Sequence, residues 1–194
     1  MSGFLYLFLE LEEPNSDKEL DMTALNLAPE EIIKTIEDKN NPMNLGFNVM
    51  LGRNVKESFN PLNYDIRETS ITSRIERTYM SEMKKSPDHV IFFTMAMHAQ
   101  KMLYIYLCNR LGAEYSADAA EIAKVWPTEF SFHLPKIVDD PEIIQTVKIN
   151  SITKRKEPGS YMVSLSSTIN ELELSAPKCV VYVEPEYADK DISL

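Results

Sequence analysis

The feature that most constrains this chain is a long apolar run, PDHVIFFTMAMHAQKMLYIYLCNRLG, over residues 87–112. If the run is helical, its polar residues Thr94, His98 and Lys101 fall on one narrow stripe, and apolar residues fill most of the remaining arc. A helix that is apolar around so much of its circumference must be covered on nearly all sides. We therefore predict one long helix that is buried in protein.

The ends of the run carry helix-boundary signals. Pro87 and Asp88 are typical of a helix start, and Arg110 and Gly112 are typical of a helix end. A membrane-spanning helix is the alternative, because about 18 apolar residues are enough to cross a bilayer. A lysine, a histidine and a glutamine in the middle of the run argue against it, since a central charge costs about 2.5–3.5 kcal/mol even on lenient insertion scales. We expect no membrane span.

The residues that follow the helix read as consecutive antiparallel strands. Residues 113–128 are expected to form a connection, with a helical turn or two in DAAEIAKVW. The polar tail after residue 186 is expected to fray. Before the helix, residues 64–80 are ambiguous, although their threonine and isoleucine content favours a strand over a helix. Alternating polar and apolar residues, with turns at 158–159 and 170–171, predict strands over 129–134, 143–155, 160–169 and 172–185.

The first third of the chain is harder to read. Residues 4–11 predict a strand, and residues 47–51 predict a short strand. Between them a short helix is expected, opened by a proline and two acids at 28–31 and stopped at residues 40–42. We therefore divide the chain into an N-terminal extension, 1–63, made of a strand plus a short helix, and a main domain, 64–194. One curved antiparallel sheet wrapped around a long central helix would bury the apolar run. The predicted fold class is α+β.

Composition argues against several classes of function. A net charge of −10 repels phosphate backbones, which argues against nucleic-acid binding. The five glycines are too far apart for a phosphate-binding loop, so no nucleotide cofactor is expected. One mildly basic segment could meet a polyanion or simply be a solvated face, and it contains Arg67, Arg74, Arg77, Lys84 and Lys85.

Cysteine usage and the opening residues bear on the compartment. Cys108 and Cys179 lie in apolar stretches and read as small buried residues, which fits a reducing environment. The opening MSGFLYLFLELEEP lacks the basic region and the small-residue cleavage site of a signal peptide. A cytoplasmic protein is therefore the expectation.

Short stretches of the sequence resemble a known family. Asp88-His89-Val90 followed by Ala99-Gln100, and Phe130-x-Phe132 followed by Asp140-Pro141, resemble the hotdog domains of A-factor (γ-butyrolactone) biosynthesis proteins. In that fold an antiparallel sheet wraps a long central helix, and the resemblance extends over roughly residues 64–186. It implies acyl-CoA or acyl-carrier thioesters as substrates, fatty acid or polyketide metabolism, and a homodimer or higher oligomer. If the protein is active, thioesterase-like or dehydratase-like chemistry is implied.

Two departures from the family pattern bear on catalysis. Ile91-Phe92 stand where the family has Pro-Gly, and Met97 stands where the family's helix glutamate falls. The first change removes the turn that lets a thioester approach the helix start, and the second removes the acid of a His/Glu pair. The resemblance therefore implies an acyl-thioester binding or processing protein, with a catalytically degenerate member of the fold left open.

The candidate catalytic residues are Asp88, His89 and His98. His89 could polarise a thioester carbonyl or act as a general base, with Asp88 orienting it. Alternatively, His89 is a neutral hydrogen-bonded residue and Asp88 a helix-start acid. His98 is either functional or a satisfied core histidine. The histidines and cysteines lack metal-ligand spacing, so neither a metal nor another cofactor is predicted.

A second hypothesis competes with the acyl-thioester protein. It is a non-catalytic interaction or assembly protein that oligomerises through its sheet and binds protein or a hydrophobic ligand. The methionines Met95, Met97 and Met102 fit either a core or an adaptable pocket for an acyl chain. The Gly-poor, Asn- and Met-rich composition also permits a viral or host-directed structural protein.

Overall fold

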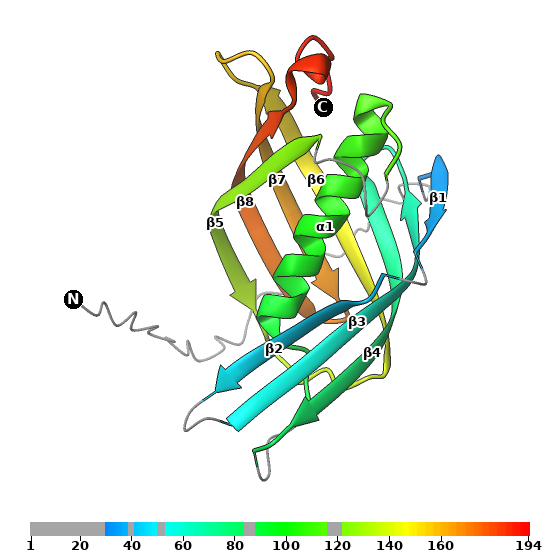
Figure 1. The fold of residues 1–194 in the computed structure, drawn as a ribbon, viewed down its shortest axis with the longest axis vertical. Coiled ribbons are helices and arrows are strands. Elements are labelled where there is room, and N and C mark those ends of the chain that lie inside the picture. Colours follow the sequence, from blue (N-terminus) through cyan, green and yellow to red (C-terminus); the bar gives the residue numbers. More distant parts are fainter. Residues whose placement is uncertain (1–29, 39–40, 50–52, 84–87, 116–121) are drawn as a thin grey trace, which may run out of the picture.

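The structure is a computed structural model that describes residues 30–38, 41–49, 53–83, 88–115 and 122–194. Within these ranges, eight strands form one antiparallel sheet and a long helix, α1, crosses its inner face (Figure 1). This arrangement confirms the predicted α+β class. The elements are β1 (Lys34–Glu37), β2 (Met43–Val49), β3 (Arg53–Ile66), β4 (Ser70–Ser81), α1 (Phe92–Leu111), β5 (Ala123–His133), β6 (Glu142–Lys154), β7 (Ser160–Ile169), β8 (Leu172–Val183) and the 3-10 turn η1 (Pro185–Tyr187).

The order of the strands follows from the position of the helix in the chain. The sheet runs β1-β3-β4-β6-β7-β8-β5, and β2 also pairs with β3, beside β1. The chain leaves the sheet after β4, passes through α1 and re-enters at the far edge as β5, so that β4 pairs with β6. The three strands β6, β7 and β8 agree closely with the prediction. Their turns hold Gly159 and Asn170 at positive φ (67° and 51°), where glycine and asparagine cost least.

The helix ends where the sequence predicts and starts later. Gly112 adopts the left-handed conformation (φ 66°), and its N–H donates to Asn109 O at the end of α1. At the other end the chain stays extended through Ile91, because the Val90 N–H donates to Val138 O (2.7 Å) and the Ile91 N–H to the carboxylate of Glu57. Among the described residues no helix has the length and apolarity needed to cross a bilayer. The predicted cytoplasmic location stays a prediction.

The expectation that the helix is covered on nearly all sides is wrong for its first half. Thr94 and His98, on the polar stripe, are fully buried, whereas Phe92, Phe93 and Met97 are 45%, 43% and 38% exposed. The helix therefore turns its polar stripe toward the sheet and part of its apolar face outward. Burying the stripe costs little for His98, because the sheet supplies polar side chains that meet its ring nitrogens.

Two predictions of helical structure are wrong. Residues 34–37 form β1 instead of part of a short helix, because β3 offers an edge with which they pair, from Lys34 opposite Ile66 to Glu37 opposite Asn63. Ala123 to Trp126 belong to β5 instead of a helical turn, because they pair with β8. In both cases tertiary pairing overrides a weak local preference.

The remaining predictions before the helix divide into three groups. Strand structure over 64–80 is confirmed, although the stretch is the end of β3, a turn and most of β4 instead of one strand. The strand expected at 47–51 is confirmed as part of β2 in its described residues. Residues 4–11 lie outside the described residues. The domain boundary at residue 63 stays a prediction; β3 crosses it, and β1 and β2 join the same sheet as the later strands.

The expectation that the C-terminal tail frays is also wrong. Ile192 is fully buried, and the Leu194 N–H donates to Ile152 O (3.1 Å). The Tyr161 hydroxyl donates to Lys190 O (2.5 Å), while Lys190 Nζ donates to Leu111 O at the end of α1. The tail therefore covers the C-terminal end of the helix with an apolar contact and several hydrogen bonds.

Candidate functional site

The fold does not bring the three predicted catalytic residues to one place. Asp88 and His89 precede α1, which begins at Phe92. His98 is the seventh residue of the helix, about 9 Å along its axis from Phe92 at a rise of about 1.5 Å per residue. Asp88 Oδ1 forms an ion pair with Arg77 Nη2 (2.7 Å). The ring of His89 lies 5.9 Å from that of Tyr79. These positions divide the candidates into a pair at the start of the helix and a separate histidine beneath it.

A buried carboxylate on strand β3 caps the N-terminal end of helix α1. The N-cap residue of α1, Ile91, makes no side-chain hydrogen bond that caps the helix. Instead, Glu57 of β3 accepts the Ile91 N–H (3.1 Å) and forms an ion pair with Arg77 Nε (2.6 Å). Burial raises the pKa of Glu57, and the nearby Thr94 hydroxyl, Arg77 and the Ile91 N–H oppose that rise. The carboxylate of Glu57 thus holds the backbone donor at the helix start.

Sequence reasoning missed Glu57, although a signal was present. Along β3, Val55, Glu57 and Phe59 alternate toward the core, and Glu57 is only 1% exposed. An acid at an inward position of an alternating strand indicates a buried partner, here Arg77 of β4. Reading that signal required knowing that residues 53–66 form a strand, and we predicted no strand over residues 53–63 from the sequence.

His98 is the centre of a buried network between α1 and the sheet. Gln145 Nε2 donates to Met95 O (3.0 Å) and Ser167 Oγ (2.9 Å), so its Oε1 faces His98 Nδ1 (2.8 Å). Nδ1 therefore carries the proton, and Nε2 accepts from the Tyr64 hydroxyl (3.2 Å). Burial lowers the pKa of His98 to about 4. A neutral histidine with both nitrogens engaged ties the helix to the sheet.

His89 lines an open cavity at the start of the helix. We call it the His89 cavity; its volume is about 560 Å³. Of the three predicted residues, His89 lines this cavity and Asp88 and His98 do not, and Phe93 also lines it. The other lining residues are Val55, Tyr79, Met83, Ile91 and Phe92.

A second, smaller cavity lies between the helix and the edge strand β5. This α1–β5 cavity has a volume of about 160 Å³, and Phe93 lines both it and the His89 cavity. Sequence reasoning offered Met97 for an acyl-chain pocket but did not place that pocket between α1 and β5. Of the noted motif Phe130-x-Phe132, Phe130 lines the cavity, and Phe132 packs on Phe92 with ring centroids 5.1 Å apart. Its walls are formed by Phe93, Ala96, Met97, Ala99, Gln100, Leu103, Val125, Pro127, Phe130, Leu165, Leu174, Ala176 and Cys179.

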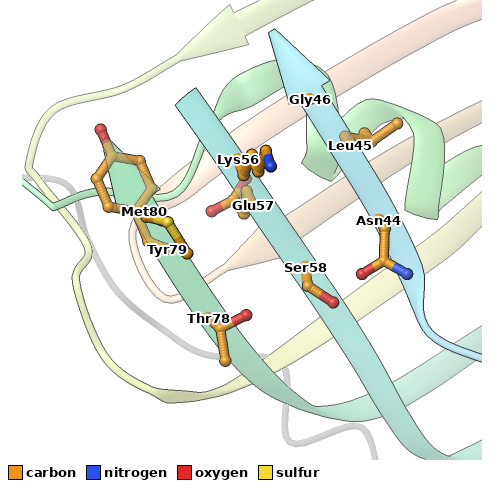
Figure 2. Close-up of a pocket in the computed structure, with 9 residues that line it drawn as sticks. All are labelled: Asn44, Leu45, Gly46, Lys56, Glu57, Ser58, Thr78, Tyr79 and Met80. Atoms are coloured by element: carbon orange, nitrogen blue, oxygen red, sulfur yellow. The ribbon is translucent and has the colours of Figure 1, made fainter. Parts of the chain in front are cut away.

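A third depression lies over β2, β3 and β4 and is lined by both polar and apolar side chains (Figure 2). Its volume is about 500 Å³. The strand register sets Asn44, Ser58 and Thr78 side by side, and the next row holds Gly46, Lys56 and Met80. None of the predicted catalytic residues lines it. Most residues of these two rows are exposed, so the depression lies on the solvent-facing side of the sheet.

Comparisons with protein-family models, curated proteins and solved structures found no match. The resemblance to hotdog domains therefore stays a prediction. Among the described residues, no group of three or more histidine, cysteine or acidic side chains gathers in an arrangement that could hold a metal ion.

Proposed function

We propose that the protein binds a hydrophobic ligand in the α1–β5 cavity and does not act on it chemically. One observation carries this proposal: the helix buries its polar stripe and leaves Phe93 and Met97 at the mouth of an apolar cavity. Exposed apolar side chains around a concave apolar site are typical of a surface that another molecule covers. The ligand would lie between these two side chains and Phe130, which is 51% exposed.

The size of the apolar mouth supports appreciable affinity. Covering the exposed parts of Phe93, Met97 and Phe130 would remove on the order of 200 Å² of apolar surface from water, taking aromatic side chains at about 200 Å² each. At about 25 cal/mol per Å², that burial contributes roughly 5 kcal/mol before the entropy of association is subtracted. A ligand of modest size could therefore bind with useful affinity through this contact.

Three features of the helix start support binding over catalysis. Asp88 is paired with Arg77, the Ile91 N–H is held by Glu57, and His98 is sealed in the core. A thioester carbonyl would find that donor already occupied by a carboxylate, which would also repel a developing negative charge. Of the three predicted catalytic residues, His89 lines the His89 cavity, so an enzymatic function at that cavity would depend on His89.

The resemblance to hotdog domains favours the acyl chain of a CoA or carrier thioester as the ligand. The test is a panel of acyl-CoA thioesters, followed by equilibrium binding and by release of free thiol. We expect saturable binding without thiol release. Ala96→Trp, which places a large ring at the half-buried cavity wall, should weaken binding at least tenfold. Ala113→Trp, another half-buried alanine beyond the helix end, should leave binding unchanged.

Two results would overturn the proposal in different directions. Thiol release that disappears in His89→Ala would establish an acyl-thioester-processing enzyme. If the folded protein binds no member of the panel, its ligand is not an acyl thioester. Mass spectrometry of co-purified lipid would then test for another hydrophobic ligand in the cavity.

A non-catalytic assembly protein is the second candidate, and the exposed apolar residues support it. Phe92, Phe93, Met97 and Phe130 could be covered by a second copy. Pairing through the edge of β5 is less favoured, because Gln100 Nε2 donates to Val125 O (3.2 Å), Pro127 lacks an N–H, and the register with β8 shifts twice.

Sedimentation velocity distinguishes this second candidate from the first. If copies associate through the apolar mouth, Phe130→Ser should shift an oligomer toward the monomer. Ile144→Ser is the matched control, since Ile144 is 52% exposed and points to the outer face of β6. If the sedimentation coefficient of an oligomer stays the same in both variants, the interface lies elsewhere.

A further inference from the structure

We infer that the α1–β5 cavity selects a small neutral ligand, or the end of a larger one, that carries a single hydroxyl or N–H donor for the side-chain oxygen of Gln100. This inference rests on the proposed function, because it concerns the ligand of the same cavity. It goes further by naming the chemical class that the cavity walls favour.

The volume of the cavity limits the size of the group that enters it. A dry protein cavity of about 150 Å³ lined by apolar side chains holds a single benzene ring. The α1–β5 cavity, at about 160 Å³, therefore has room for one ring or a chain of about six carbon atoms. Its inner wall is fixed, because Ala99, Leu103 and Ala176 are almost fully buried. A longer chain would have to project past Phe93 or Phe130 into solvent.

The wall of the cavity carries no formal charge. All of its lining residues are apolar except Gln100 and Cys179. Cys179 is 2% exposed, and burial raises the pKa of its thiol to about 11, so the thiol stays neutral near pH 7. A carboxylate or an ammonium group would lose its hydration here without a counter-charge, which is costly. The part of the ligand that enters must be neutral.

Gln100 supplies the polar contact that distinguishes one neutral ligand from another. Its Nε2 donates to Val125 O (3.2 Å), which fixes the orientation of the amide and leaves Oε1 as the free end. In the described part of the chain, Oε1 has no hydrogen-bond donor. A ligand hydroxyl or N–H would provide that donor, whereas a plain hydrocarbon would cover the oxygen and leave it unsatisfied.

The test compares two rings of nearly equal size, phenol and benzene, on the full chain. Binding is followed by NMR of ¹³C-labelled methionine methyl groups, because Met97 lines the cavity and Met80 lies on the outer face of β4. We expect both ligands to shift Met97 and not Met80. Phenol should bind about threefold to tenfold more tightly, as one net hydrogen bond allows.

Two variants assign the preference to Gln100. Gln100→Leu should abolish or reverse the preference for phenol, because the leucine offers no acceptor. Asn109→Leu is the matched control: it removes another half-buried amide of α1, outside the cavity, and should keep the preference. A thermal unfolding curve for each variant shows that it is folded before the comparison is made.

The outcomes separate this inference from the function on which it rests. Equal binding of phenol and benzene by the unmodified protein, or a preference that survives in Gln100→Leu, would overturn the inference and leave hydrophobic-ligand binding standing. If neither ring binds while acyl-CoA thioesters do, the size argument is overturned and the proposed function remains. If no ligand of either kind binds, both fall.

Discussion

Acidification should weaken the fold through His98, and the effect can be isolated by one substitution. His98 is fully buried and its pKa is lowered from 6.5 to about 4, so between these values the unfolded chain binds a proton that the folded chain does not. The free energy of unfolding therefore falls as the pH drops from about 6.5 toward 4. At about 1.4 kcal/mol per pH unit, the full loss is about 3 kcal/mol, and about 2 kcal/mol of it is lost by pH 5.

His98→Asn removes the titrating group and keeps part of the network. The asparagine amide nitrogen occupies a place close to that of Nδ1 and can still donate to Gln145 Oε1, while the contact with Tyr64 is lost. We expect the variant to be less stable than the unmodified protein at pH 7. The difference in the free energy of unfolding between the two proteins should then narrow by about 2 kcal/mol between pH 7 and pH 5. Only the unmodified protein loses stability through the lowered pKa of His98.

The assay is urea unfolding of both proteins at several pH values between 7 and 5. Other groups, Glu57 among them, also titrate, but they are common to both proteins and cancel in the difference. His133→Asn, which removes an exposed histidine of β5, is the control and should leave the pH dependence unchanged. A stability gap between the unmodified protein and His98→Asn that is the same at pH 7 and pH 5 would refute the reasoning.

Three further predictions address the tail, the buried ion pair and the cavity. Ile192→Ala should cost about 2–4 kcal/mol in the free energy of unfolding, because it empties a fully buried site, and a loss below about 0.5 kcal/mol would mean that the tail does not pack. Glu57→Gln should cost about 3–5 kcal/mol by leaving the buried charge of Arg77 without Glu57, and adding Arg77→Met should restore much of the loss; no recovery in a denaturant titration would contradict this. A ligand in the α1–β5 cavity should slow modification of Cys179 by a small thiol reagent and leave Cys108 unaffected, as mass spectrometry can measure; equal protection of both would indicate global stabilisation.

Local patterns were sufficient for the three consecutive strands β6, β7 and β8. β6, β7 and β8 alternate with a period of two and are joined by turns at Gly159 and Asn170, so each signal lies within a few residues of the element that it defines. The end of α1 at Gly112 was equally readable, because a helix end depends on nearby residues. The α+β class follows from these elements.

The candidate site was predicted only in part. Asp88 and His89 do lie together before the helix, but His98 is directed into the core, and the place of the cavity between α1 and β5 was not predicted. A helical wheel gives the polar stripe of Thr94 and His98, yet it cannot say whether that stripe meets water or the sheet. The answer depends on Tyr64 and Gln145, which are 34 and 47 residues away from His98 in the chain.

The sequence by itself determined the strands β6, β7 and β8, the turns that join them, and that one long helix must be largely buried, because these properties depend on neighbouring residues. Only the tertiary structure decided that Glu57 caps this helix, that the segment around Lys34 becomes a strand, and that Ile192 seals the far end. Each of these outcomes depends on a partner far away in the chain. Long-range partners are fixed only when the sheet closes around the helix, and that closure leaves Phe93, Met97 and Phe130 exposed around a cavity.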